Sequence, residues 1–218
     1  MVAAERVLRG EVLTGWPEAH AEVLELPVHL EAWEPPYMLA TYKAHEIQAP
    51  SPEVTQLTAE GSAAGAEPID DDELHRALLD LATTWVTGSG GRAEAAVVES
   101  GVAGAIGALG ARSFLIGEVH PREALALMAW AAASGGAHGR RRGAAAGRSA
   151  AWWVAAELTG LDWPPDPDEL FREMGRLRWY RWEPHEMTGG WNLHLAVEDP
   201  DDGWSAAIAA EDRSEEGS

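Results

Sequence analysis

The stretch GGAHGRRRGAAAGRSAAWWVAAELTG, residues 135–160, carries small residues and arginines at helical spacing. Gly139, Gly143 and Gly147 recur every four residues, which places them in one row along a helix. A glycine inside a helix costs roughly 0.5–1 kcal/mol relative to alanine, so a row of them needs a physical reason. Either a neighbouring backbone packs closely against the row, or a ligand lies against it. The spacing predicts a helix over 139–159 that determines how the surrounding elements pack.

The arginines of this helix make it a candidate anion site. The N-terminus of a helix favours anions because its N–H groups are free and its dipole is positive there. Guanidinium groups add forked donors that match carboxylates and phosphates. A phosphate- or carboxylate-bearing metabolite is the ligand class that this pattern indicates. The predicted anion-binding residues are Arg140, Arg141, Arg142 and Arg148.

Two aromatic segments are candidates for binding a protein partner. Trp152 follows Arg148 by four residues, within reach of a cation–π contact. Residues 177–182 alternate with a period of two, as expected for a strand. Both segments also fit a second interpretation, in which the aromatic rings lie in the core and the arginines pair with nearby acids. The predicted partner-binding residues are Trp152, Arg178, Tyr180, Arg181 and Trp182.

Charge argues against a nucleic-acid or membrane-surface function. The 218 residues carry a formal net charge of −20. A surface of that sign repels duplex nucleic acid and anionic lipid. The exception is the middle of the chain, because residues 112–181 carry ten basic and eight acidic side chains. An anion pocket is therefore compatible with that part of the sequence.

Composition narrows the classes of chemistry. The chain has no cysteine, which excludes disulfides and thiolate catalysis. We find no GxSxG, HExxH or P-loop motif, and the eight histidines lack metal-ligand spacing, so we assign no catalytic residue, metal site or cofactor. The N-terminus lacks a signal-peptide pattern and no apolar run is long enough to span a bilayer, so we expect a cytoplasmic protein. Fifteen arginines against one lysine indicate a bacterium with a GC-rich genome.

The pattern of apolar residues predicts an α+β fold. A largely antiparallel sheet is expected to pack against a helical hairpin of residues 121–134 and 139–159, with a short βαβ unit in the middle of the chain. Alternation over Arg6–Leu13, 21–33 and 37–48 predicts three N-terminal strands. We expect a single domain over 1–218. The alternative is an N-terminal β-subdomain over 1–50, with a linker or long loop over 51–69.

The sequence leaves two functional hypotheses open. The first is a non-enzymatic protein that binds a protein partner or associates with itself, favoured by the missing catalytic motifs and the uneven charge. The second is an enzyme or sensor that binds a small anion on the arginine-bearing helix. Whether the chain is an enzyme stays undecided, because a catalytic site can also be assembled from scattered residues.

Overall fold

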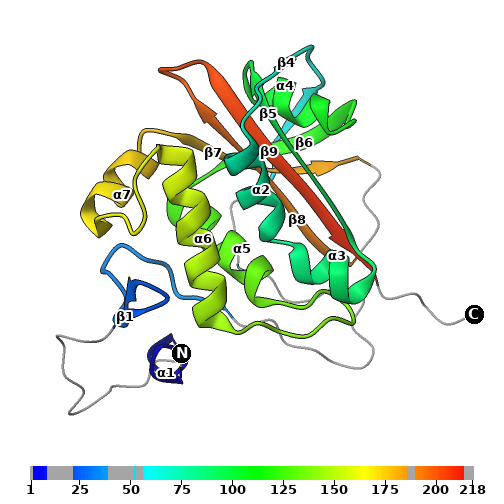
Figure 1. Cartoon of the computed structure of the whole chain (residues 1–218). Helices are drawn as coiled ribbons and strands as arrows, with labels where there is room; N and C mark the ends of the chain where they lie inside the picture. The colour runs from blue at the N-terminus through cyan, green and yellow to red at the C-terminus, as the bar shows by residue number, and fades with distance from the viewer. Residues whose placement is uncertain (1, 9–21, 39–51, 53–55, 186–189, 214–218) are drawn as a thin grey trace, which may run out of the picture.

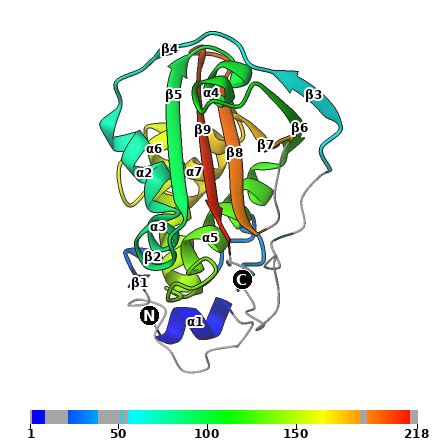
Figure 2. The same cartoon turned by 90° about the vertical axis from the view of Figure 1, so that its right-hand side faces the viewer.

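A computed structural model describes residues 2–8, 22–38, 52, 56–185 and 190–213. These residues form a sheet with helices on both of its faces (Figures 1 and 2). The helices are α1 Val2–Leu8, α2 Asp72–Asp80, α3 Thr83–Ser89, α4 Val102–Ala108, α5 Pro121–Ala133, α6 Ala144–Thr159 and α7 Pro167–Met174. The strands are β1 Glu22–Val23, β2 Leu26–Pro27, β3 Ala59–Ser62, β4 Glu67–Pro68, β5 Arg92–Glu99, β6 Ser113–Val119, β7 Arg178–Pro184, β8 Trp191–Asp199 and β9 Trp204–Asp212.

The main sheet has the strand order β3-β6-β7-β8-β9-β5-β4, and every neighbouring pair is antiparallel. The C-terminal meander β7-β8-β9 forms its centre, and its first strand contains the alternating residues 178–182 that were expected to form a strand. The two edge strands, β3 and β4, come from the segment expected to be a linker or long loop. The α+β class and the largely antiparallel sheet are confirmed.

The β5-α4-β6 unit is more open than a compact βαβ motif. Successive antiparallel pairings make β5 and β6 point in the same direction, but β9, β8 and β7 lie between them. The connecting helix α4 therefore crosses one face of the sheet, and in Figure 2 it lies in front of the strands. Ile106 of α4 packs there in a small apolar cluster with Phe114 and Trp182.

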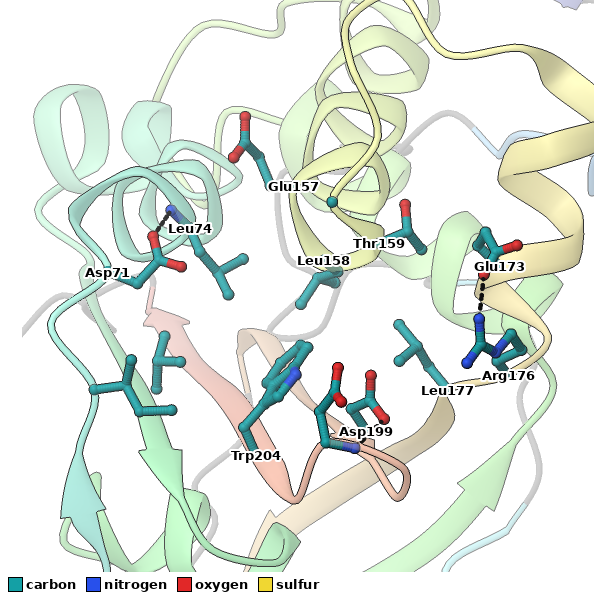
Figure 3. Close-up of a pocket in the computed structure, with 14 residues that line it drawn as sticks. Asp71, Leu74, Glu157, Leu158, Thr159, Glu173, Arg176, Leu177, Asp199 and Trp204 are labelled. Carbon is teal, nitrogen blue, oxygen red and sulfur yellow. Dashed lines mark hydrogen bonds and ion pairs between the residues drawn. The ribbon is translucent and has the colours of Figure 1, made fainter.

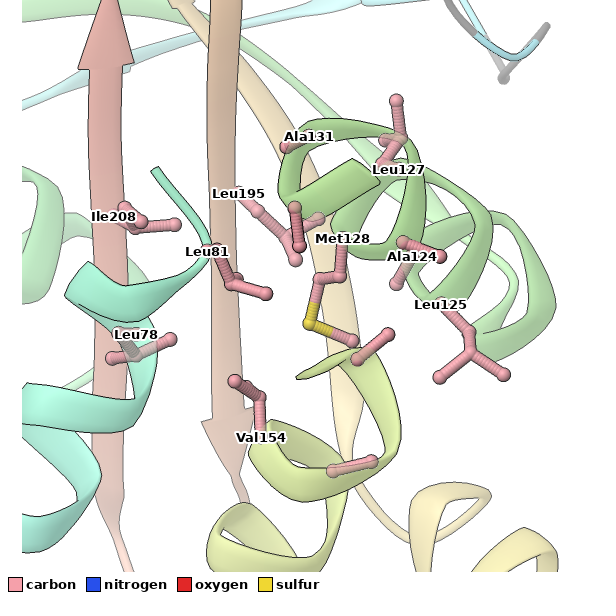
Figure 4. Close-up of a cluster of buried hydrophobic side chains, with 14 of the residues drawn as sticks. Leu78, Leu81, Ala124, Leu125, Leu127, Met128, Ala131, Val154, Leu195 and Ile208 are labelled. Carbon is pink, nitrogen blue, oxygen red and sulfur yellow. The ribbon is translucent and has the colours of Figure 1, made fainter. Parts of the chain in front are cut away.

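The opposite face carries the main core, which α2, α3, α5, α6 and α7 cover. Helix α5 is buried along its whole length after the first turn, which matches its nearly continuous apolar sequence. In Figure 4 the side chain of Met128 extends from α5 toward α6, where Val154 lies. Leu195 of β8 and Ile208 of β9 close this core from the sheet side.

Helices α5 and α6 form the predicted hairpin, and Gly147 explains how closely they approach. A Cβ atom at Gly147 would lie 2.7 Å from the Cβ of Ala133 and closer still to the carbonyl oxygen of Ala129. Real Cβ atoms do not occur at such distances from other atoms, so a larger residue would push the helices apart. Gly147 therefore allows α5 and α6 to pack closely against each other.

The start of α6 differs from the prediction. The helix begins at Ala144 and not at Gly139, because Gly143 adopts φ +95°, a left-handed conformation that ends the preceding loop. Within that loop a Cβ at Gly135 would collide with the carbonyl oxygen of Gly139. Only one of the three spaced glycines, Gly147, is therefore part of the helix.

The predicted N-terminal sheet is wrong where the structure describes it. Residues 2–8 form the helix α1 instead of the start of a strand. Residues 22–27 form the two-residue strands β1 and β2, which pair only with each other among the described strands. Residues 28–33 and 37–38, also predicted as strand, form none. The remaining predicted strand residues, 9–13, 21 and 39–48, lie outside the described part of the chain.

Candidate functional site

The predicted anion-binding residue Arg148 holds a carboxylate of the chain itself. Arg148 is 3% exposed, and its Nε and Nη2 donate to the two carboxylate oxygens of Glu34 at 2.7 and 2.5 Å. Its Nη1 and Nη2 donate to the carbonyl oxygens of Pro27 and His29. The guanidinium lies 5.1 Å from the ring centroid of Trp152, which confirms the expected cation–π contact. Arg148 is thus a buried cation whose donors are already engaged.

The Glu34 carboxylate is the centre of this network. Besides Arg148, it accepts hydrogen bonds from the Trp152 Nε1 at 3.0 Å, the Tyr37 hydroxyl at 2.5 Å and the Glu31 backbone N–H at 2.9 Å. Burial, together with the negative charge of Glu34, raises the pKa of the Tyr37 hydroxyl well above its usual value. The network joins the N-terminal segment 22–38 to α6.

A second internal carboxylate lies at the N-terminus of α6. The backbone N–H of Ala145 donates to Glu5 Oε1 at 2.8 Å. This is the position where the helix dipole favours an anion. Two features that the sequence indicated for a ligand, the helix N-terminus and Arg148, are therefore both satisfied by carboxylates from the N-terminal part of the chain.

The three consecutive arginines differ from Arg148. Arg140, Arg141 and Arg142 are exposed in the loop that precedes α6. Arg142 lines a groove along the outer face of that helix. Arg148 lies apart from them in the core, so the four predicted anion-binding residues do not form one pocket.

The predicted partner-binding residues are divided between core and surface. Trp152 and Trp182 are 0% and 2% exposed, the core position that their second interpretation anticipated. Tyr180 is partly buried and its hydroxyl donates to Glu198 at 3.4 Å, while Arg181 pairs with Glu183. Arg178 is exposed. Because the rings of Trp152 and Trp182 are buried, neither is exposed to a protein partner.

The groove along the outer face of α6 has a volume of about 890 Å³, and no sequence pattern indicated it. Its floor is a helical row of mostly small residues on α6. Figure 1 shows this helix between the β1 hairpin on one side and α2 and α3 on the other. The lining residues are Leu24, Glu25, Ala77, Asp80, Thr83, Thr84, Arg142, Ala146, Ser149, Ala150, Trp153 and Trp163.

Exposed apolar side chains concentrate at one end of this groove. Trp153 and Leu24 are 40% and 44% exposed although both are large and apolar. The Trp153 ring meets Trp163 edge to face at 5.2 Å, and Trp163 Nε1 donates to Glu25 at 2.7 Å. Leu24 and Glu25 have φ values of +57° and +63°, which non-glycine residues rarely adopt. Both residues form the two-residue turn between β1 and β2, and a tight hairpin turn of this length commonly has positive φ at both positions.

A smaller pocket of about 380 Å³ lies at the C-terminal end of α6 (Figure 3). Burial, followed by the charges of Glu73 and Asp71, raises the pKa of Glu157 at its rim. Arg176 pairs with Glu173 at 3.0 Å and with Asp201 at 3.1 Å. The pocket lining is acidic, and the charge of its arginine is already neutralised.

The face of the sheet that α4 covers holds a buried histidine. His194 is 4% exposed and lies 4.6 Å from the Trp182 ring, while its Nε2 is 3.4 Å from Glu211. The hydrogen bond from His194, and to a smaller extent the one from Arg92, lowers the pKa of Glu211 to about 2. Partial burial acts in the opposite direction but is outweighed. The Nδ1 atom of His194 has no hydrogen-bond partner in the described structure.

The described residues contain neither a metal-binding cluster nor a membrane-spanning helix. No set of three or more of their histidine or acidic side chains is arranged to hold a metal ion. None of the described helices has the length and apolarity needed to cross a bilayer.

Comparison with known proteins assigns the chain to a family. No curated protein and no solved structure matches the chain. A family model described as "Family of unknown function (DUF6183)" matches residues 1–214. Because this match covers nearly the whole sequence, the chain belongs to the DUF6183 family.

Proposed function

We propose that the chain is a non-enzymatic protein-interaction module that binds a segment of a partner protein in the groove along α6. The observation that carries the proposal is the exposed Trp153 ring, packed against the partly buried Trp163 at the end of a preformed groove. Tryptophans in such positions contribute a large share of the binding energy at protein interfaces. The lack of a recognisable catalytic motif in the sequence is compatible with this function.

The dimensions of the groove suit a short extended segment. The floor residues Ala146 and Trp153 are seven positions apart on α6, which corresponds to about 10 Å along the helix. An extended peptide advances about 3.3 Å per residue, so roughly three residues span this floor, and a longer segment reaches Arg142 in the loop before α6. Because the floor residues Ala146, Ser149 and Ala150 are small, the backbone of such a segment can approach α6 closely.

Charge indicates what kind of partner segment fits. The chain carries a net charge of −20, and both acids of the groove, Glu25 and Asp80, lie on its walls. A field of this sign attracts partners of net positive charge and accelerates their association. We therefore assign as occupant a segment with an aromatic or aliphatic anchor for Trp153 and with basic residues beside it.

A random peptide library tests the proposal, because it samples every class of short segment. Heptapeptides displayed on phage are selected on the immobilised full chain, and enriched sequences are synthesised for titration. We expect enrichment of an aromatic or large aliphatic residue next to arginine or lysine. Trp153→Ala should weaken binding by about thirtyfold, the effect of a typical interface hot spot of about 2 kcal/mol.

Val86→Ala is the matched control, since Val86 on α3 is 44% exposed but does not line the groove. It should leave the dissociation constant within about twofold, as expected for a surface change outside the contact. Equal binding by Trp153→Ala and the wild type would refute the groove as docking site. If light scattering instead shows a dimer that Trp153→Ala dissociates, the occupant is a second copy of this chain.

A further inference from the structure

Arg142 supplies the groove with a cation whose charge is not neutralised within the described structure. Among the residues that the structure describes, its guanidinium makes no hydrogen bond or ion pair. The two acids of the groove are engaged: Glu25 accepts from Trp163 Nε1 at 2.7 Å, and Asp80 accepts from Thr83 Oγ1 at 3.1 Å. Arginine presents five donors in a fork that matches a carboxylate. The donors of Arg142 are thus available to a ligand in the groove.

The backbone beneath Arg142 is held in place. The N–H groups of Arg142 and Gly143 donate to the carbonyl oxygen of Ala133 at 3.0 and 3.3 Å, at the C-terminal end of α5. The base of the side chain is therefore fixed relative to the groove floor. Such preorganisation lowers the entropic cost of forming a bidentate contact.

We propose that Arg142 determines specificity by binding an aspartate or glutamate side chain of the partner segment. This inference rests on the proposed function, because it assigns a second contact within the same groove. The long-range field of the chain disfavours acidic partners, whereas Arg142 favours one carboxylate at one position. Because Arg142 precedes the start of α6 and lies beyond the Ala146 end of the floor, that acid should lie more than about three residues from the side chain that contacts Trp153.

The test combines variants of the protein with variants of an enriched peptide. C-terminally amidated peptides are used, so that the side-chain acid is the only carboxylate at that end. Exchanging this acid for its amide should weaken binding to the wild type about five- to tenfold, as expected for a partly exposed charged contact. With Arg142→Ala the exchange should have no effect. Arg140→Ala is the matched control. It also removes one arginine charge, but Arg140 lies two positions before Arg142 and does not line the groove.

The outcomes separate this inference from the proposed function. Equal weakening by Arg142→Ala and Arg140→Ala, or enriched sequences without an acid at that spacing, would overturn the role of Arg142 alone. Binding that Trp153→Ala leaves unchanged would overturn the groove itself. The absence of any enriched sequence would overturn both.

Discussion

Removing the carboxylate of Glu34 should destabilise the fold more than almost any other single change outside the apolar core. Its oxygens accept five hydrogen bonds, two of them from Arg148. In Glu34→Ala, Arg148 keeps only the carbonyl oxygens of Pro27 and His29 and its contact with the Trp152 ring. A buried cation would then lack its counter-charge.

The size of the effect follows from the burial of both partners. The side chains of Arg148 and Glu34 are 4% and 0% exposed, so water compensates neither charge. Breaking a buried pair by removing one partner costs about 3–5 kcal/mol. For a domain of this size, that loss corresponds to a fall in melting temperature of roughly 6–20 °C.

The assay is urea unfolding followed by tryptophan fluorescence. Arg148→Ala and the double variant complete a mutant cycle, and the double variant should cost clearly less than the sum of the single ones. Glu60→Ala is the control, since Glu60 is exposed on β3 and should change stability by less than about 0.5 kcal/mol. A loss below about 1 kcal/mol in Glu34→Ala, or additive effects in the cycle, would refute the central position of this pair.

Three further predictions concern stability. Gly147→Ala should destabilise by about 2 kcal/mol or more despite its gain in helix propensity, because the new Cβ would collide with the carbonyl oxygen of Ala129. Thermal unfolding beside Gly65→Ala, where a Cβ meets nothing within 4 Å, checks this, and equal melting temperatures would contradict it. Glu157→Gln should raise stability at pH 7, because the raised pKa of Glu157 means that ionisation opposes folding. That gain should vanish below the ordinary pKa of a carboxyl group, and a gain independent of pH would argue against this cause. Glu211→Gln should lower stability at pH 7 by about 1 kcal/mol, allowing for solvent screening. Because the pKa of Glu211 is held at about 2, its contribution is full above the ordinary carboxyl pKa and is lost as pH falls through about 2. Urea titrations from pH 7 to 2 should show the two proteins converging, and a constant difference would contradict the pairing.

Local signals in the sequence predicted much of the fold. Asp71 and Asp166 cap α2 and α7, His120 and Pro121 open α5, and Gly160 ends α6 in a left-handed conformation. Each of these depends on neighbours a few residues away, which a sequence displays directly. The alternating pattern likewise predicted that Trp179 and Trp182 face opposite sides of β7.

Contacts between distant residues explain what could not be predicted. Glu34 and Arg148 are 114 positions apart, so the sequence indicates an arginine suited to an anion but not that the anion is Glu34. The groove depends on how the β1 hairpin, α2 and α6 come together, and no local motif encodes that arrangement. The exposure of Trp153, beside the buried Trp152, is visible only once α6 is packed.

Hydrogen exchange of the full chain with and without an enriched peptide tests the groove most directly. A peptide bound in the groove should slow exchange in α6, around Ala146–Trp153, and in the adjoining ends of α2 and α3. Backbone amides of β7, where the exposed Arg178 lies, should be unchanged. Protection confined to β7, or spread evenly over the molecule, would contradict binding in the groove.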